Sequence, residues 1–238
     1  MKKLQLYLSH NGVCSRREAM IKIQEGQVMV NDRTVTEPST QINPNVDQVR
    51  VNGRLVGTKE FKYILLNKPA GFVTTMSDPD GAKTVYELLP PRYHHLKPVG
   101  RLDKNTQGLL LFTNDGDMAN KLTHPRYNIN KVYIVAVEGR LNSENQKKIE
   151  RGVMVEGKKT SPAEIRNVMY EEKSERSEFT IAIHEGRKRQ VRLMMEAVGH
   201  KVVFLKRIQQ GPLKITALHI GQYRRLSDEE MAALNQIQ

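Results

Sequence analysis

The sequence lacks several residue types on which common protein classes depend. Its 238 residues include no tryptophan and a single cysteine, Cys14, and aromatic residues make up 5%. A single cysteine excludes an internal disulfide framework and a paired-cysteine metal site, which agrees with a reducing compartment. No apolar run approaches the roughly 20 residues that a membrane-spanning helix needs. With 38% hydrophobic and 27% charged residues, the composition is that of an ordinary soluble globular protein.

The N-terminus also lacks the features of a secretion signal. A basic start at Lys2 and Lys3 is followed by Gln5, Ser9 and His10, which interrupt the apolar stretch of a signal peptide. We therefore expect the protein to be cytoplasmic.

The sequence motifs of several enzyme classes are missing as well. The chain has no GxxxxGK[ST] phosphate-binding loop, no GxSxG nucleophile elbow and no HExxH zinc motif. The adjacent His94 and His95 project differently, and no carboxylate partner is evident nearby in the sequence. Because a bound metal needs a full ligand set, we expect no metal, and nucleotide triphosphates are not favoured as substrates.

Positive charge is what the sequence has in excess. There are 38 lysine and arginine residues against 26 acidic residues, for a net charge of +12. This excess points to a polyanion, because cations that neutralise phosphates release condensed counterions. An anionic membrane surface would call for a basic amphipathic helix with exposed aromatic residues, and none is evident. Nucleic acid is therefore the favoured partner, and plain solubility is the alternative explanation of the charge.

The first 58 residues have the pattern of a compact unit with a helix and a hairpin. Ser15 with Glu18 forms a capping-box pattern that begins a helix, and Gly26 supplies its left-handed end. A strand at 27–30 follows, then a tight turn and a return strand. We therefore predict a small α/β domain at residues 1–58.

Three cations lie on or beside the first turn of that helix: Arg16, Arg17 and Lys22. Positive charge at this end opposes the helix dipole, so helix stability does not explain Arg16 and Arg17. A solvated helix face is the alternative. We regard all three as candidate RNA-binding residues.

A polar linker around 53–60 separates this unit from a second domain at residues 59–238. The apolar patterns predict strands at 63–66, 109–112, 132–137 and 179–183, and helices at 143–151, at 187–198 and after Ser227. Ser143 with Gln146 reads as the capping box of the first of these helices. Strands and helices that do not alternate regularly predict an α+β fold.

One acidic residue, Asp103, stands in a polar loop that leads into a buried strand. The loop spans residues 98–108, contains Gly100 and Gly108, and continues into the apolar segment 109–112. A rigid strand that holds a loop carboxylate is a common way to place a catalytic group. The alternative is that Asp103 caps the turn or pairs with a neighbouring cation.

A second candidate region is the cation-rich start of the helix expected at 187–198. Val191 and Met194 belong to an apolar stripe that we assign to the core, which turns Arg189 and Arg192 toward another face. Positive charge at a helix start opposes the dipole, and a local rule broken in this way often marks a site. An ordinary Arg192 to Glu196 helix pair is the alternative.

These segments together resemble a known family. The motifs that carry the resemblance are GRLD at 100–103, GLLL at 108–111, TNDG at 113–116, KVY at 131–133, GRKRQVR at 186–192, EAVGH at 196–200 and GPL at 211–213. The chain resembles the bacterial ribosomal RNA pseudouridine synthases of the small- and large-subunit uridine pseudouridylation type from residue 60 onward. Residues 3–54 resemble the RNA-binding module of small-subunit ribosomal protein four. Departures occur at Gln209, Gln210 and Leu193, which bear on RNA grip or target choice.

The resemblance implies a catalytic domain built on a largely antiparallel mixed sheet with flanking helices, and a cofactor-free isomerisation of uridine to pseudouridine. It implies that Asp103 is the essential carboxylate, that Tyr133 stacks on the target base, and that Arg192 pairs with Asp103. It also implies that Arg101 fills the gap left by the flipped nucleotide, and it makes the cations at 187–189, Arg187, Lys188 and Arg189, candidates for binding RNA.

The expected partner is ribosomal RNA, and we expect a monomer. The alternative function is that of a ribosome-associated RNA-binding protein without catalysis. Joint retention of Asp103, Tyr133 and Arg192 favours the enzyme, because a pure binder gains nothing from a carboxylate that faces RNA. The sequence leaves open which ribosomal subunit and uridine are modified, and whether Asp103 acts as nucleophile or base.

Overall fold

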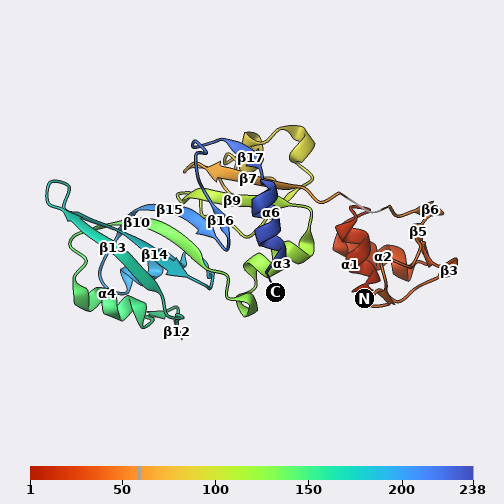
Figure 1. Cartoon of the computed structure of the whole chain (residues 1–238), viewed down its shortest axis with the longest axis horizontal. Helices are drawn as coiled ribbons and strands as arrows, with labels where there is room; N and C mark the ends of the chain where they lie inside the picture. The colour runs from red at the N-terminus through yellow and green to blue at the C-terminus, as the bar shows by residue number, and fades with distance from the viewer. Residues whose placement is uncertain (58–59, 238) are drawn as a thin grey trace. The chain divides into compact units, whose positions relative to one another are not determined.

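The computed structural model describes residues 1–57 and 60–237, and the chain divides into two compact units (Figure 1). The N-terminal unit comprises Met1–Phe61 with Asn114–Gly116, and the larger unit comprises Lys62–Thr113 and Asp117–Gln238. The domain boundary predicted between residues 58 and 59 lies outside the described residues. Each unit is therefore considered by itself.

The N-terminal unit combines two helices with short strands among its described residues. Its elements are β1 (Lys2–Lys3), α1 (Leu4–His10), α2 (Arg16–Gln24), β2 (Val28–Val30), β3 (Arg33–Thr34), β4 (Gln41–Ile42), β5 (Val49–Val51) and β6 (Arg54–Leu55). Strands β3, β2, β5 and β6 form one sheet in that order, and β1 pairs with β4. The unit has its own apolar core, to which both helices and three of the strands contribute.

Local sequence chemistry explains how α2 begins and ends. The Glu18 backbone N–H donates to Ser15 Oγ at 3.2 Å, and the Ser15 N–H donates to Glu18 Oε2 at 2.7 Å. The predicted capping box is therefore confirmed, and Gly26 has the expected left-handed φ of 71°. The following hairpin turns through Asn31 and Asp32, whose φ values of 49° and 61° suit a tight two-residue turn.

The larger unit is built on one extended sheet. Its strands are β7 (Tyr63–Lys68), β8 (Lys97–Pro98), β9 (Gln107–Thr113), β10 (Lys131–Glu138), β11 (Met154–Val155), β12 (Lys158–Lys159), β13 (Glu164–Glu171), β14 (Arg176–Ile183), β15 (Val202–Gln210), β16 (Leu213–Lys214) and β17 (Tyr223–Arg225). Its helices are η1 (Val85–Leu88), η2 (Pro91–Tyr93), α3 (Gly116–Thr123), η3 (Pro125–Tyr127), α4 (Ser143–Glu150), α5 (Gln190–Glu196) and α6 (Asp228–Asn235).

The order of the main sheet is β13, β14, β10, β15, β9, β7 and β17. Neighbouring strands along this path run antiparallel except β15 and β9, which run parallel and are paired at Lys206 with Gln107 and at Arg207 with Gly108. The predicted α+β class with a largely antiparallel mixed sheet and flanking helices is confirmed. Of the strands on this path, β13, β15 and β17 were not predicted.

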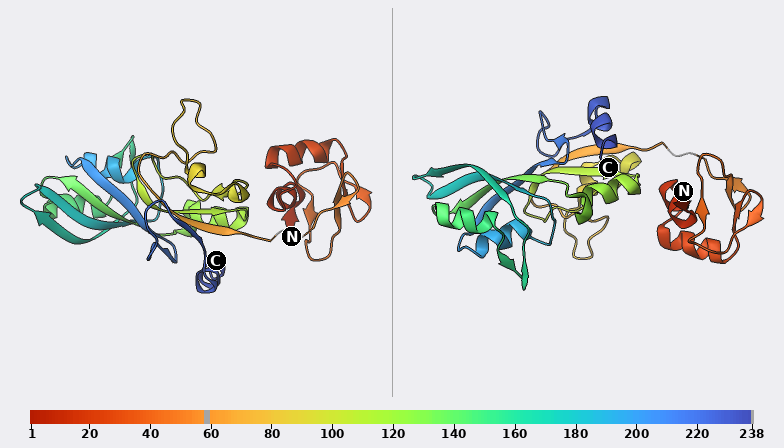
Figure 2. Two further views of the ribbon diagram at one scale, coloured as in Figure 1. Left: turned by 90° about the horizontal axis from the view of Figure 1, so that it is seen from above. Right: turned by 60° about the horizontal axis from the view of Figure 1, so that its bottom comes forward.

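Two apolar layers cover opposite faces of the β7 and β9 end of the sheet. Side chains alternate along β7, so Ile64 and Leu66 enter one core while Tyr63 and Leu65 enter another. The first core continues along β10, β14 and β15 to α4 and α5, and the second is closed by α3 and α6. Figure 2 shows α4 beside the β13 and β14 end of this sheet. Burial on both faces explains why β7 and β9 are continuous apolar runs.

One predicted helix cap and one predicted helix start were wrong, and both errors have a local cause. Asn142 caps α4, because its side chain accepts from the Asn145 N–H at 2.8 Å, so the proposed Ser143 box does not form. Helix α5 begins at Gln190 rather than 187, because Arg189 adopts a left-handed φ of 53°. The other predicted helices and strands of the larger unit are present. Within the described residues, no helix is long and apolar enough to cross a membrane.

Candidate active site

A cleft of about 600 Å³ opens on the larger unit where the Asp103 loop, the sheet and the start of α5 meet. Its volume falls in the range of small-molecule sites, which is about 300–1,000 Å³. The candidate residues among those that line it are Arg101, Asp103, Tyr133, Arg187, Lys188 and Arg189. The cleft therefore gathers most of the sites predicted from residues 100–103, 133 and 187–189.

The backbone of the Asp103 loop is held at every carbonyl from residue 102 to residue 106. Lys68 Nζ donates to the carbonyls of Asp103 and Lys104 at 3.2 Å and of Thr106 at 2.8 Å. Thr74 Oγ1 donates to the Leu102 carbonyl at 2.8 Å. The remaining carbonyl, that of residue 105, accepts from Arg192, as described below. The loop is therefore fixed by long-range contacts and presents the half-buried Asp103 side chain to the cleft.

The ammonium of Lys68 is buried with a relative exposure of 0%. Burial lowers the pKa of Lys68 to about 8, and the charge of Asp103 opposes that shift. Lys68 ends β7, and its predicted strand was assigned only as far as residue 66. A lysine that closes an apolar strand was the available signal for this residue.

Gly108 joins the loop to β9 at a place where no side chain fits. A β carbon there would lie 2.1 Å from the Arg207 carbonyl oxygen, and φ is 104°. This close approach belongs to the parallel pairing of β9 with β15. Glycine is therefore required at 108 for the loop and the sheet to meet.

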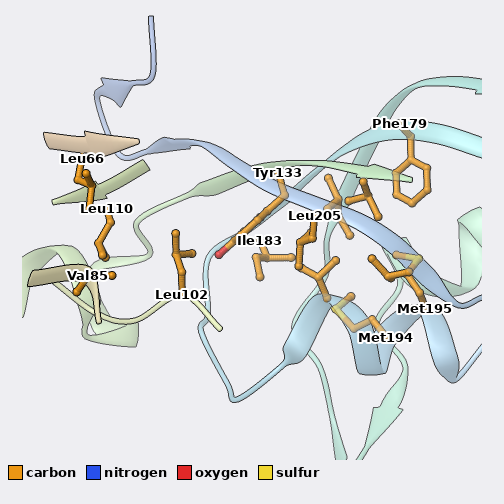
Figure 3. Close-up of a cluster of buried hydrophobic side chains, with 14 of the residues drawn as sticks. Leu66, Val85, Leu102, Leu110, Tyr133, Phe179, Ile183, Met194, Met195 and Leu205 are labelled. Carbon is orange, nitrogen blue, oxygen red and sulfur yellow. The ribbon is translucent and has the colours of Figure 1, made fainter. Parts of the chain in front are cut away.

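Tyr133 lies on the floor of the cleft. It is 8% exposed and pairs across the sheet with Arg207 of β15. Figure 3 shows its ring among Leu102, Ile183 and Leu205, with the hydroxyl end directed toward the space between Leu102 and Ile183. These apolar neighbours also line the cleft, so a planar ring that entered it would meet an apolar surface and an aromatic side chain.

The direct ion pair expected between Arg192 and Asp103 is not present. Arg192 Nη2 donates to the Asn105 carbonyl and Nη1 to the Val202 carbonyl, both at 3.1 Å. Burial and the charge of Arg189 lower the pKa of Arg192, whereas the charge of Asp103 raises it. Arg192 thus holds the loop through the Asn105 carbonyl and interacts with the charge of Asp103 without a direct contact. The correction follows from geometry: two backbone carbonyls already satisfy this guanidinium.

Arg187 and Arg189 also have specific partners. Arg187 donates to the carbonyls of Lys158 and Lys159 at 3.2 and 2.8 Å, and its Nη2 lies 3.3 Å from Glu185. Arg189 lies 3.8 Å from Glu196, so the helix pair considered for Arg192 involves Arg189 instead. The left-handed φ of Arg189 at the edge of a cleft is the kind of backbone strain that clusters at functional sites.

The other predicted cations are divided between the two units. Arg101 and Lys188 are exposed at the cleft. Arg16 and Arg17 are exposed on the first turn of α2, whereas Lys22 is half-buried and donates to Gln27 Oε1 at 3.3 Å. These three belong to the N-terminal unit and do not line the cleft.

The floor of the cleft holds two further buried cations, Lys131 and Arg207, which were not predicted as site residues. They are 6% and 2% exposed. Burial and the charge of Arg207 lower the pKa of Lys131 to about 8, and Glu185 opposes the shift. The alternation of β10 places Lys131 on the same face as Tyr133, which was the available sequence signal. Across residues 1–57 and 60–237, no group of three or more histidine, cysteine or acidic side chains could hold a metal ion.

Comparisons with known proteins show which family the chain resembles along most of its length. The family model of RNA pseudouridylate synthase matches residues 62–197. An uncharacterised RNA pseudouridine synthase of Aquifex aeolicus is 43% identical over 98% of this chain and 93% of its own. A relative from Bacillus subtilis, named ribosomal large subunit pseudouridine synthase B, is 43% identical over 98% of this chain and 96% of its own. A crystal structure of a pseudouridylate synthase matches with a TM-score of 0.68 and 28% identity, covering 98% of this chain and 100% of that one.

Proposed function

The chain belongs to the RNA pseudouridylate synthase family, and we propose that it converts a specific uridine of ribosomal RNA to pseudouridine with Asp103 as the catalytic carboxylate. The observation that carries the assignment is the Asp103 loop, whose carbonyls from 102 to 106 are all held while its carboxylate faces a cleft. The name of the Bacillus subtilis relative supports ribosomal RNA as the substrate. The net charge of +12 supports an RNA partner.

The reaction determines what the cleft has to do. The bond from ribose C1′ to uracil N1 breaks, the ring turns, and a new bond joins C1′ to C5. The proton on C5 is lost and N1 gains one, so no atom is exchanged overall and no cofactor is needed. Because the base is reached outside its stack, the uridine is flipped into the cleft.

Each predicted residue then has a role. Asp103 attacks the sugar or the ring, or removes a sugar proton. Tyr133 offers its ring to the extruded base. Arg101 stands at the rim, where it fills the space that the flipped nucleotide leaves in the RNA. Arg192 positions the Asp103 loop through residue 105 and adds positive potential.

The rim and the N-terminal unit bind the RNA around the target. Lys188 and Arg189 contact phosphates beside the cleft, whereas Arg187 supports the loop between β14 and α5. Arg16 and Arg17 give the N-terminal unit an exposed cationic helix start, as suits an RNA-binding domain. We propose that the protein acts as a monomer in the cytoplasm.

The experiment is an adduct map of ribosomal RNA. RNA from cells that lack the protein loses one or a few carbodiimide adducts of pseudouridine, and these positions identify the target. Expression of the wild type and of Asp228→Asn, an exposed carboxylate on α6, restores them, whereas Asp103→Asn does not. An unchanged map in the deleted cells would refute the function. Restoration by Asp103→Asn would refute the role of Asp103 and favour the non-catalytic alternative.

A further inference from the structure

Besides Asp103 and Tyr133, the cleft is lined by two buried cations, Lys131 and Arg207, on its floor. Lys131 and Tyr133 are two residues apart on β10, so their side chains share one face of the strand. On β15, Arg207 is paired with Tyr133, and Gln210 is paired with Lys131. All four line the cleft. Two adjacent strands therefore place an ammonium, a guanidinium and an amide on its floor.

The hydrogen-bonding capacity of these groups is only partly used. Lys131 Nζ donates to the carbonyls of Ile129 and His184, at 3.3 and 3.4 Å. Arg207 Nε donates to the Leu109 carbonyl at 2.9 Å, but its buried Nη2 has no partner among the described residues. The same holds for Oε1 of Gln210, which is 1% exposed. A buried polar atom without a partner is unfavourable, so a water molecule or a ligand that bonded these atoms would stabilise the site.

Within the described part of the chain, the positive charges of Lys131 and Arg207 are also not neutralised by a carboxylate of their own. The charge of Glu185 acts on Lys131, but this carboxylate already accepts from the Ser161 N–H at 2.9 Å and from Gln190, and it pairs with Arg187. Among the described residues, neither Lys131 nor Arg207 forms an ion pair with a carboxylate. Two buried like charges without an anion are costly, and an electron-rich ligand at this position would lower the free energy of the site.

We propose that Lys131 and Arg207 bind the carbonyl oxygens of the flipped uracil and stabilise the negative charge that its ring acquires during the reaction. This inference rests on the proposed function, because it requires the target base to enter this cleft. A phosphate is the other ligand of suitable chemistry. The exposed Arg101, Lys104 and Lys188 at the rim are placed for phosphates, whereas a flat base fits a buried position beside the Tyr133 ring.

The reaction requires a cation beside the uracil ring whether Asp103 acts as a nucleophile toward the sugar or as a base. When the C1′–N1 bond breaks, its electron pair goes to the ring, which becomes an anion with charge shared among N1, O2 and O4. The sugar carbon is meanwhile held as an ester of Asp103, or as the alkene left after Asp103 removes the C2′ proton. When C5 bonds to C1′, the ester bond to Asp103 breaks, or, on the alkene route, Asp103 returns its proton to C2′. The C5 proton then leaves and N1 gains a proton, which restores a neutral ring. A fixed cation beside O2 or O4 stabilises the anion in both cases.

The same contact would give selectivity among bases. The two cations donate hydrogen bonds and accept none. Uracil presents an oxygen at its fourth ring position, whereas cytosine presents an amino group that would face these donors. A site built to bond the oxygen rejects the analogue that lacks it.

The test combines a substitution in the protein with the replacement of one uracil oxygen by sulfur in the RNA. The full-length wild type, Lys131→Met and the matched control Lys201→Met, whose side chain is 75% exposed, act on the RNA identified by the adduct map. The RNA carries uridine, 2-thiouridine or 4-thiouridine at the target, and the single-turnover rate of isomerisation is measured at saturating enzyme. We expect Lys131→Met to be slower by about a hundredfold or more on uridine, with RNA affinity within threefold.

The thio substrates decide whether the lysine touches the ring. In the wild type and in Lys201→Met, one of the two sulfur replacements slows the reaction by about tenfold, because sulfur is the weaker hydrogen-bond acceptor. In Lys131→Met, that replacement has little further effect. Equal sulfur penalties in wild type and Lys131→Met would overturn the proposal. So would a variant whose loss lies in RNA affinity and salt dependence alone, which is the outcome for a phosphate contact.

Folding is monitored by thermal unfolding, and Arg207→Lys provides a second variant that keeps the charge but removes the Nη2 donor. It is expected to slow the reaction while leaving RNA affinity within threefold, and the same sulfur cycle is applied to it. A wild-type rate in Arg207→Lys and unchanged sulfur penalties would exclude the guanidinium from the site. If the wild type itself forms no pseudouridine, the proposed function fails. If it does and Lys131→Met matches it, this inference alone fails.

Discussion

The floor and the rim of the cleft both carry positive charge, but in different physical settings. On the floor, Lys131 and Arg207 are no more than 6% exposed and donate to backbone carbonyls, as does the buried Lys68 of β7, which holds the Asp103 loop. On the rim, Lys188 and Arg101 are exposed. Exposed charges are screened by salt, whereas buried ones act strongly over short distances. The same residue types thus serve geometry and chemistry on the floor and RNA binding on the rim.

After Lys131→Met, the largest effect expected on this comparison comes from Lys68→Met, because the change removes the donor shared by carbonyls of the Asp103 loop. The rate should fall by roughly 10- to 100-fold through loss of positioning, while RNA affinity stays within about threefold. Unsatisfied carbonyls should lower the free energy of unfolding by about 1–3 kcal/mol. Single-turnover kinetics, RNA titration and urea unfolding test this, with the exposed Lys147→Met on α4 as control. A variant with weakened RNA binding and a normal rate would remove the distinction between floor and rim.

The next prediction concerns the pH dependence of kcat/KM, which we attribute to the buried lysines. Burial lowers the pKa of both Lys68 and Lys131 to about 8. If the charged form of Lys131 is required, kcat/KM is full below pH 8 and falls by about tenfold per pH unit above it. The fall should be shallower in Lys131→Met.

Titration of Lys68 and Lys131 cannot cause this loss of activity by unfolding the protein. Lysine in an unfolded chain has a pKa of about 10.4, so between about pH 8 and 10 the unfolded state binds more protons than the folded state. The two lysines therefore make the free energy of unfolding rise with pH over this window. Activity and thermal unfolding measured from pH 6 to 10 separate the effects. A constant kcat/KM up to pH 10 would contradict the requirement for charge.

A smaller effect distinguishes two neighbours in the segment before α5. Lys188→Gln should weaken RNA binding a few-fold and reduce the slope of log affinity against log salt by about 0.7–0.9, with an unchanged rate at saturation. Arg187→Gln should instead lower the melting temperature, because its guanidinium is bound to the carbonyls of Lys158 and Lys159. Salt-dependent binding curves and thermal melts compare the two variants. If both variants changed RNA binding and melting temperature alike, Lys188 and Arg187 would not have the separate roles in RNA binding and stability that we assign to them.

The smallest effect is expected in the N-terminal unit. Replacing both Arg16 and Arg17 by glutamine should weaken RNA binding by a few-fold at most and leave the single-turnover rate unchanged. The change should also raise the free energy of unfolding by a few tenths of a kcal/mol, because it removes positive charge from a helix start. RNA titration and chemical unfolding measure the two. Weaker RNA binding without a gain in stability would mean that the helix dipole is already compensated.

The sequence predicted those parts of the fold and of the site that depend on local chemistry. The Ser15 and Glu18 capping box, the glycines that bound the Asp103 loop and the Tyr133 strand are set by residues close together in the chain. The start of α5 was missed because it depends on the left-handed Arg189.

The parts that sequence patterns missed depend on distant pairing. Lys68 reaches a carbonyl 38 residues away, Arg207 one 98 residues away and Arg192 one 87 residues away. Strand β15, which carries Arg207, was itself not predicted, and its antiparallel pairing with β10 brings Arg207 beside Tyr133 on the floor. A periodicity in a single segment carries no information about such contacts. The direct Arg192 to Asp103 ion pair was expected from the family resemblance, and Arg192 instead donates to the carbonyls of Asn105 and Val202.

The central claim is that the cleft presents Asp103 to a uridine as the reacting carboxylate. Its most direct test is the single-turnover rate of pseudouridine formation by Asp103→Asn on the mapped RNA, measured together with RNA affinity. The account predicts RNA affinity within about threefold of wild type and a rate lower by about a thousandfold or more. A mutant that forms pseudouridine at the wild-type rate would contradict it.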